Sequence, residues 1–257
     1  MMKRNKSAAR AMDLLLLLAE SKDGLTLLEI ENALEIPKSS TFELVYTLVD
    51  KMFLEQKDRK FSIGINAFRI GFSYTEKLDL VLLAKNTLEE LAKQTNETVF
   101  LGRYVQNQVI YVDKHIGDAQ MAYTCKVGTT KELYCTALGK AILARISEKE
   151  VEDYFRTFTL EKFTERTIVT IEKMKIEIMQ IRQRGYSIEN GEGSKDVYCI
   201  GAPIMDYKNE VMGAISVTSP SFQMSEEKSE KFGNLIAEAA LMISRKLGYG
   251  GIRLYAE

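Results

Sequence analysis

Residues 36–53, IPKSSTFELVYTLVDKMF, decide the first part of the fold. Pro37 disfavours helical backbone at the residue before it, so an earlier helix ends there and a new one begins. We expect Ser39 or Ser40 to cap the new helix, which continues to about Lys51. Apolar residues at three- and four-residue spacing predict a buried stripe on one side of it. The predicted stripe is Thr41, Leu44, Val45 and Leu48, continued by Met52.

The opposite face of this helix combines aromatic, hydroxyl and acidic side chains. Its residues are Ser39, Phe42, Glu43, Tyr46 and Asp50, with Ser40 and Thr47 beside them. Clustered exposed aromatic rings need an explanation, and base reading supplies one, since a ring edge can contact a thymine methyl group. Glu43 has two interpretations: it closes a capping box with Ser40, or it accepts a hydrogen bond from a cytosine amino group.

The flanking sequence completes a winged helix-turn-helix pattern. Ser7 precedes a helical repeat over residues 8–20, and Thr26 with Glu29 predicts a capping box for a second short helix. Residues 53–64, FLEQKDRKFSIG, predict a hairpin with a basic tip, which is the wing. The apolar positions predicted for the first helix are Ala8, Ala11, Met12, Leu15, Leu16 and Leu18 or Ala19.

The basic residues of the N-terminal segment, residues 1–62, lie mainly at two places, although the formal net charge of this segment is zero. They are Lys3, Arg4, Lys6 and Arg10 at the N-terminus and Lys57, Arg59 and Lys60 at the wing tip. A winged helix contacts the DNA backbone with these two parts, so we expect them to bind phosphate. The candidate DNA-binding residues are Arg10, Lys38, Ser39, Ser40, Phe42, Glu43, Tyr46, Thr47, Lys57, Arg59 and Lys60.

Composition excludes several other classes of protein. The chain has 257 residues, a formal net charge of −1 and 46% hydrophobic residues, as in ordinary globular proteins. Its longest leucine run, residues 14–18, is too short to span a membrane. Three cysteines favour a reducing cytoplasm over a disulfide framework, and the single histidine, His115, excludes a multi-histidine zinc site. Neither a phosphate-binding loop nor a dinucleotide motif is present, so we expect no cofactor. Since no apolar run is long enough for a membrane span, we also expect no membrane partner.

The rest of the chain predicts a linker followed by an α+β domain. Residues 66–94 form a long helical stretch with a break near Leu78 and Asp79, a candidate dimerisation element. Beyond it we expect a hairpin that turns at 106–108, a third strand at 119–125, three helices and two further strands. We expect a final helix that is capped by Ser225 and ends at Gly248. The predicted domains are 1–64, the linker 65–80, and 81–250.

Four blocks of the chain resemble the IclR family of bacterial transcriptional regulators. They are residues 7–56, ELYCTALGKAILA at 132–144, IRQRGYSIENGE at 181–192, and YCIGAPIMDYKNEVMGAISVTSPS at 198–221. The resemblance implies an N-terminal winged helix-turn-helix, a linker helix and a C-terminal GAF-like domain that binds a small effector. Family members act as homodimers or homotetramers on double-stranded operator DNA, as repressors or activators. Family sequences commonly have a basic residue where Glu43 stands.

The resemblance also implies the effector-contacting positions. They are Ala137, Leu138, Glu189, Cys199, Ser216 and Thr218. Ser216 and Thr218 are two residues apart on one strand and face the same side, and the start of a helix at Ala137 offers free N–H groups. This combination suits a carboxylate, although hydroxyls satisfied by their own sheet are the alternative.

Glu189 and Leu138 depart from the family pattern. Many members have Asp at the first position, and some have a smaller residue at the second. A carboxylate beside an anionic ligand is costly unless it is protonated or hydrogen-bonded, so Glu189 could instead accept from a ligand hydroxyl. We expect a small polar metabolite, most simply an organic acid, as the effector.

Two further interpretations stay open at this point. Cys135 and Cys199 flank the expected pocket, which allows a thiol- or metal-dependent enzyme, while small buried apolar cysteines are the alternative. The winged helix could also serve protein contacts only, in a small-molecule sensor without DNA binding. We predict a regulator that is not an enzyme, with no catalytic residue and no metal ligand.

Overall fold

The computed structural model describes residues 5–75, 79–117 and 125–255. Contacts divide the chain into two compact units, residues 1–78 and 79–257. Among the described residues, no helix is long and apolar enough to cross a membrane.

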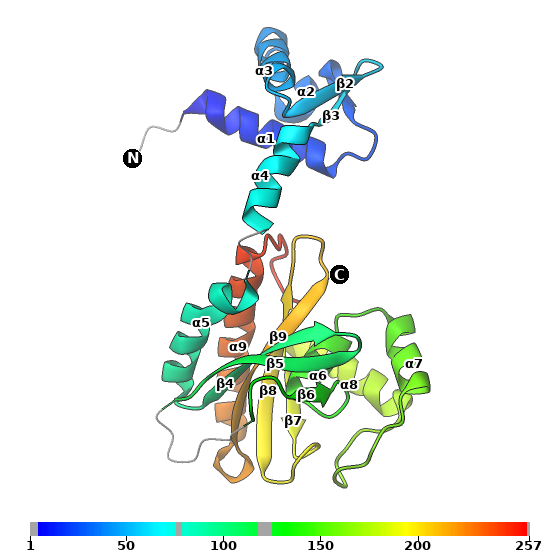
Figure 1. The fold of residues 1–257 in the computed structure, drawn as a ribbon, viewed down its shortest axis with the longest axis vertical. Coiled ribbons are helices and arrows are strands. Elements are labelled where there is room, and N and C mark those ends of the chain that lie inside the picture. Colours follow the sequence, from blue (N-terminus) through cyan, green and yellow to red (C-terminus); the bar gives the residue numbers. More distant parts are fainter. Residues whose placement is uncertain (1–4, 76–78, 118–124, 256–257) are drawn as a thin grey trace. The chain divides into compact units, whose positions relative to one another are not determined.

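The first unit is a winged helix-turn-helix followed by one more helix (Figure 1). Its elements are α1 (Lys6–Glu20), β1 (Leu25–Thr26), α2 (Leu27–Leu34), α3 (Lys38–Asp50), β2 (Leu54–Lys57), β3 (Lys60–Ile63) and α4 (Ile65–Thr75). The three strands form an antiparallel sheet in the order β1-β3-β2. The capping box predicted at the start of α2 is present, because the Thr26 side chain accepts from the N–H of Glu29 and the Glu29 carboxylate accepts from the N–H of Thr26.

The core of the first unit corrects the predicted face of α1. Buried side chains from α1, α2, α3 and the wing meet there: Leu14, Leu18, Ile30, Val45, Leu54 and Phe61. Met12 and Leu16, which the sequence pattern assigned to the buried face, are exposed. The error has a simple cause, since five consecutive leucines put an apolar side chain in every direction around the helix. The helix also begins one residue before Ser7 and is capped by Asn5.

The start of α3 corrects a second prediction. Its N-cap is Pro37, and neither Ser39 nor Ser40 caps it, because the helix already begins at Lys38. The capping box between Ser40 and Glu43 is therefore absent. The hydroxyl of Thr41 instead donates to the carbonyls of Ile36 and Pro37, at 3.2 Å each. The buried stripe ends before Met52, which is exposed and has a φ of 56°.

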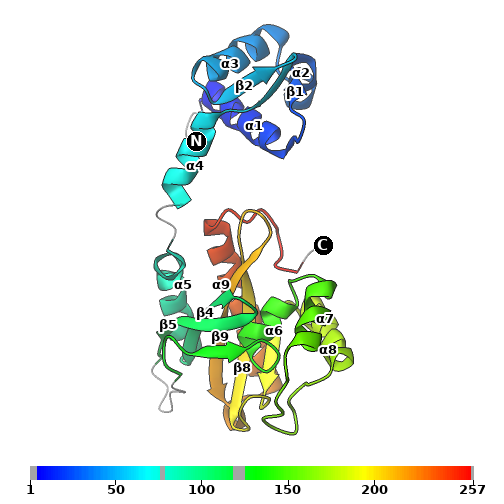
Figure 2. The ribbon, with the colours of Figure 1, turned by 45° about the vertical axis from the view of Figure 1, so that its right-hand side comes forward.

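The second unit is a six-stranded antiparallel sheet with helices on both faces (Figures 1 and 2). Its elements are α5 (Leu80–Thr95), β4 (Thr98–Val105), β5 (Gln108–His115), β6 (Thr130–Glu132), α6 (Ala137–Leu143), α7 (Glu148–Thr157), α8 (Ile171–Arg184), β7 (Ser187–Asn190), β8 (Val197–Met205), β9 (Val211–Pro220), a short 3-10 helix η1 (Ser221–Gln223) and α9 (Glu226–Lys246). The strand order is β6-β5-β4-β9-β8-β7. Helices α5 and α9 cover one face, and α6, with α7 and α8 beyond it, covers the other. This arrangement confirms the α+β prediction.

Most predicted elements of the second unit are present. The hairpin turns at Gln106 and Asn107, which both have positive φ values, 48° and 64°. Ser225 caps α9, which ends two residues before Gly248. The strand expected at 119–125 lies, apart from its last residue, outside the described residues, as does Leu78 at the expected linker break. Neither β6 nor β7 was predicted.

Candidate functional site

Aromatic rings contact one another on the outward face of α3 and at the wing. The rings of Phe42 and Tyr46 lie 4.4 Å apart, and Tyr46 meets Phe61 of β3 edge-on at 5.8 Å. Phe42 is 53% exposed, whereas Tyr46 is half-buried and packs against the core. Tyr46 was expected on the outward face, but the wing folds back beside it and covers part of its ring. Phe42 is therefore the aromatic group that this face presents to solvent.

The polar residues of α3 surround Phe42 as the sequence predicts. Lys38, Ser39 and Glu43 are exposed, and Ser40 is half-buried. The exposed Thr47 donates its hydroxyl proton to the carbonyl of Glu43 at 2.6 Å. Because its proton is used in this bond, the Thr47 hydroxyl can serve another partner only as an acceptor.

The wing tip presents its cations on a tight turn. Lys57 and Lys60 are directly paired across β2 and β3, and Asp58 and Arg59 between them have φ values of 48° and 67°. Two residues with left-handed backbone make the tight hairpin turn that matches strand twist. All four side chains are exposed, with Arg59 at the apex. Arg10 on α1 is half-buried, and the N-terminal cations Lys3 and Arg4 lie outside the described residues.

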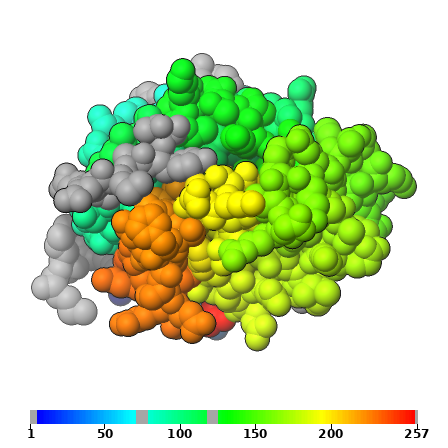
Figure 3. All heavy atoms as spheres, turned by 90° about the horizontal axis from the view of Figure 1, so that it is seen from below, coloured from blue at the N-terminus to red at the C-terminus, as the bar shows by residue number. Residues whose placement is uncertain are grey.

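In the second unit, a cavity of about 490 Å³ opens between the sheet and the start of α6. Each of the six strands contributes at least one residue to its wall. All six predicted effector positions line it: Ala137, Leu138, Glu189, Cys199, Ser216 and Thr218. Figure 3 shows this end of the unit, where the yellow loop after β7 lies between the orange start of α9 and the lime-green region of α7 and α8.

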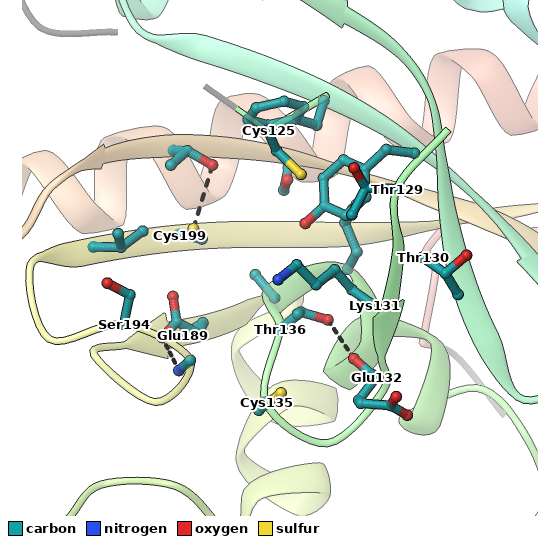
Figure 4. Close-up of a pocket in the computed structure, with 18 of the residues that line it drawn as sticks. Cys125, Thr129, Thr130, Lys131, Glu132, Cys135, Thr136, Glu189, Ser194 and Cys199 are labelled. Carbon is teal, nitrogen blue, oxygen red and sulfur yellow. Dashed lines mark hydrogen bonds between the residues drawn. The ribbon is translucent and has the colours of Figure 1, made fainter. Parts of the chain in front are cut away.

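Hydroxyl groups and the amine of Lys131 are among the polar groups of the cavity wall. Ser216 and Thr218 face the same side of β9, and the Thr218 hydroxyl lies 3.3 Å from the Cys199 sulfur. Lys131 extends from β6 into the space between Cys199 and Thr136 (Figure 4). Sequence reasoning missed Lys131, because a three-residue strand gives too little alternation to show which way a side chain points.

The start of α6 forms the floor of the cavity. Thr136 caps the helix by accepting from the N–H of Gly139 at 3.0 Å. Ala137 and Leu138 are in the first turn, where backbone N–H groups have no acceptor within the helix. All seven residues of α6 are buried, so the floor is also part of the core.

Glu189 is a buried carboxyl group on the cavity wall. Its Oε1 accepts from the N–H groups of Glu192, at 2.5 Å, and Gly193, at 3.0 Å. Burial raises the pKa of Glu189 to about 7, and the two backbone donors oppose this shift. The side chain is therefore close to half protonated at neutral pH.

A buried ion-pair network supports the loop that holds Glu189. Lys140 of α6 is 1% exposed and contacts the carboxylates of Glu192 and, at 3.4 Å, Glu177. Arg184 also contacts Glu177, at 2.8 Å. In addition, the Thr167 hydroxyl donates to the carbonyl of Glu192 at 2.7 Å. The loop after β7 is thus tied to α6, to α8 and to the segment before α8.

Of the three cysteines that line the cavity, Cys135 and Cys199 are poorly suited to nucleophilic chemistry. Burial, with a further contribution from nearby Glu189, raises the pKa of Cys135 to about 12 and raises the pKa of Cys199 well above its ordinary value. His115 contacts Asp113 at 3.0 Å and is not among the residues lining the cavity. Within the described ranges, no group of three or more His, Cys, Asp or Glu residues could hold a metal ion.

These thiol environments predict slow alkylation. At pH 8, a thiol with a pKa of about 12 is ionised to roughly one part in 10⁴, and the thiolate is the reactive species. We expect iodoacetamide to modify Cys135 and Cys199 far more slowly than a free thiol. Peptide mass spectrometry over time measures this for each cysteine, and rapid modification of either would support a nucleophilic role.

The winged helix and the polar cavity together define a ligand-responsive DNA-binding protein, and comparison with known proteins agrees. Residues 7–58 match the IclR helix-turn-helix domain, and residues 72–245 match the bacterial transcriptional regulator IclR C-terminal domain. The chain is 30% identical to the HTH-type transcriptional regulator KipR of Bacillus subtilis, over 97% of this chain and 100% of the relative. It is 28% identical to the transcriptional repressor IclR of Escherichia coli, over 96% and 91%. The solved structure of the Agrobacterium tumefaciens repressor BlcR has a TM-score of 0.74 at 27% identity, covering 95% of this chain and 97% of that one.

The chain therefore belongs to the IclR family of bacterial transcriptional regulators. This confirms the resemblance that the four sequence blocks indicated.

Proposed function

We propose that this regulator binds operator DNA through α3 and the wing, and that a small organic acid in the cavity modulates this binding. The observation that carries the proposal is the cavity itself, where Lys131, Ser216 and Thr218 bring one positive charge and two hydroxyl groups to one space. Such a set of groups suits a carboxylate. The proposed effector contacts also include Ala137, Leu138, Glu189 and Cys199.

We base the proposed domain bounds, oligomeric state, location and mode of regulation on membership of the IclR family. The DNA-binding domain comprises residues 1–64, residues 65–80 link it to the effector domain, and residues 81–250 form that domain. Homodimers or tetramers bind the operator in the cytoplasm, and the chain has no enzymatic activity. We propose repression as its mode, since two similar proteins are named repressors. The raised thiol pKa values of Cys135 and Cys199 disfavour the alternative of a thiol-dependent enzyme.

A DNA-binding titration tests this proposal. Fluorescence anisotropy with the DNA upstream of the coding sequence is measured with and without a panel of small organic acids. We expect specific binding whose affinity changes with at least one acid, because an effector acts only by binding the DNA-competent and DNA-incompetent states differently. A protein that binds the acids but not the DNA is instead a sensor.

Neutralising the wing is expected to weaken the salt dependence of operator binding. Arg59→Gln with Lys60→Gln removes two exposed cations from the tip. If each contacts one phosphate, the slope of log K against log salt becomes shallower by about 1.8. Lys93→Gln with Lys208→Gln, two exposed lysines of the second unit, changes the net charge equally and serves as the control. An unchanged slope in the wing variant would show that the wing does not contact phosphate.

A further inference from the structure

Glu189 places a carboxyl group in a cavity that otherwise suits an acid. It is 4% exposed, lies on β7 and contributes to the cavity wall (Figure 4). Its Oε1 is occupied by the two backbone N–H groups of the following loop. The other carboxyl oxygen, Oε2, accepts from neither of these N–H groups, and it is the oxygen with which Glu189 can contact a bound molecule beside the neighbouring Cys199 thiol, which also interacts with this carboxyl group.

Within the part of the chain that the structure describes, no cation forms an ion pair with this carboxyl group. The nearby Lys140 is engaged by Glu192 and Glu177. The ionisable groups around Glu189 are Glu192 from the loop after β7, Lys140 from α6, Cys135 from the segment before α6 and Cys199 from β8. Others on the cavity wall are Tyr111, Cys125, Lys126, Lys131 and Glu132.

Binding of an anionic ligand favours the protonated form of the Glu189 carboxyl group over the ionised form. Two carboxylates in contact repel each other strongly in a buried environment, so one of them takes up a proton. A protonated carboxyl group then donates a short, charge-assisted hydrogen bond to the ligand carboxylate. Glu189 has little freedom to turn away from the ligand, because the loop to which it is hydrogen-bonded is itself fixed. The hydroxyls of Thr164 and Thr167 donate to the carbonyls of Gly191 and Glu192 in this loop.

We propose that Glu189 determines the charge class of the effector, by donating a hydrogen bond from its protonated carboxyl group to a carboxylate of the ligand, so that acid binding takes up a proton from solvent. This inference rests on the proposed function of the cavity. A neutral ligand that donates a hydroxyl hydrogen bond would prefer the ionised carboxylate and would release a proton. The sign of the proton exchange therefore identifies the chemical class of the effector.

The expected magnitude follows from the ionisation of the free protein. Since burial holds the pKa of Glu189 at about 7, the free side chain is mostly ionised at pH 8 and mostly protonated at pH 6. If the bound state is fully protonated, binding takes up about 0.9 proton at pH 8 and about 0.1 at pH 6. The affinity for an acid stays constant below the pKa and falls as pH rises through it, by about tenfold between pH 6 and pH 8.

Isothermal titration calorimetry on the full chain tests this directly. Acetate and benzoate serve as anionic probes, with benzamide as a neutral molecule of nearly the same shape as benzoate. Titrations in two buffers of different ionisation enthalpy give the number of protons exchanged, and this measurement on the wild-type protein needs no variant. Glu189→Gln keeps a neutral donor at the same position, so we expect binding without proton uptake. Glu238→Gln removes an exposed carboxylate of α9 and is the matched control.

The possible results separate this inference from the proposed function. Proton uptake with an acid probe that is lost in Glu189→Gln and kept in Glu238→Gln supports it. Acid binding without proton uptake, or with uptake that persists in Glu189→Gln, overturns the inference and leaves an acid-binding cavity. No binding at pH 6 of either probe, or of any acid in the panel used for the operator titration, overturns both the inference and the proposed acid effector, and leaves that titration to test DNA binding alone.

Discussion

Replacing Lys140 by Met lowers the free energy of unfolding by about 3–5 kcal/mol, because it leaves buried carboxylates without their cation. Glu192 is buried, and Lys140 is its ion-pair partner. The Oε2 atom of Glu192 already has no hydrogen-bond partner among the described residues, so no other group replaces the contact with Lys140. Urea denaturation followed by circular dichroism measures the change as a shift of the transition midpoint.

A matched variant and a rescue variant sharpen this test. Lys175 also contacts two carboxylates, Glu148 and Glu152, but on the surface, so Lys175→Met should cost much less. Adding Glu192→Gln to Lys140→Met should recover part of the stability, since it removes the uncompensated charge. A Lys140→Met protein as stable as the wild type would show that the network does not stabilise the loop after β7.

Adding one methyl group at Gly139 is expected to disrupt the floor of the cavity. A Cβ atom at this position would overlap the backbone of Leu133, which is buried and has little room to move. Overpacking of this kind costs up to about 3 kcal/mol, more than the roughly 1 kcal/mol that Ala gains over Gly in a helix. Differential scanning calorimetry should show the transition of the second unit lowered by several degrees.

Gly250→Ala provides the comparison for this prediction. A Cβ atom at Gly250 would meet nothing within 4 Å, so the same substitution there should leave the transition nearly unchanged. Similar transitions for the two variants would mean that α6 shifts readily and that the cavity floor is adaptable.

The parts of the fold that local chemistry determines were predictable. The pair Thr26 and Glu29 marked the start of α2, and the polar turn at Gln106 and Asn107 marked the hairpin. The phase of α1 was not predictable, because the leucine run contains no polar residue to mark its outer side. The start of α3 was also missed, since Pro37 takes the position that a serine was expected to occupy.

The residues of the candidate site were also predictable only in part. Its six expected residues came from the family blocks, and the structure brings them around one cavity, although no local pattern connects positions as distant as Leu138 and Thr218. The pairing of Lys140 with Glu192 spans 52 residues, so sequence spacing could not reveal it. The raised pKa of Glu189 likewise depends on burial, which a strand of four residues does not show.

The complete burial of α6 has a consequence for how this regulator can change its effector during evolution. A substitution at Ala137 or Leu138 alters ligand contacts and core packing together, so most such changes reduce stability before a new specificity can be selected. Lys131 lies on β6 and is exposed, so its side chain can be exchanged with less disturbance of the core than that of Ala137 or Leu138. We therefore expect effector preference among close relatives to diversify first at exposed positions of the cavity wall such as Lys131, while the helical side changes slowly.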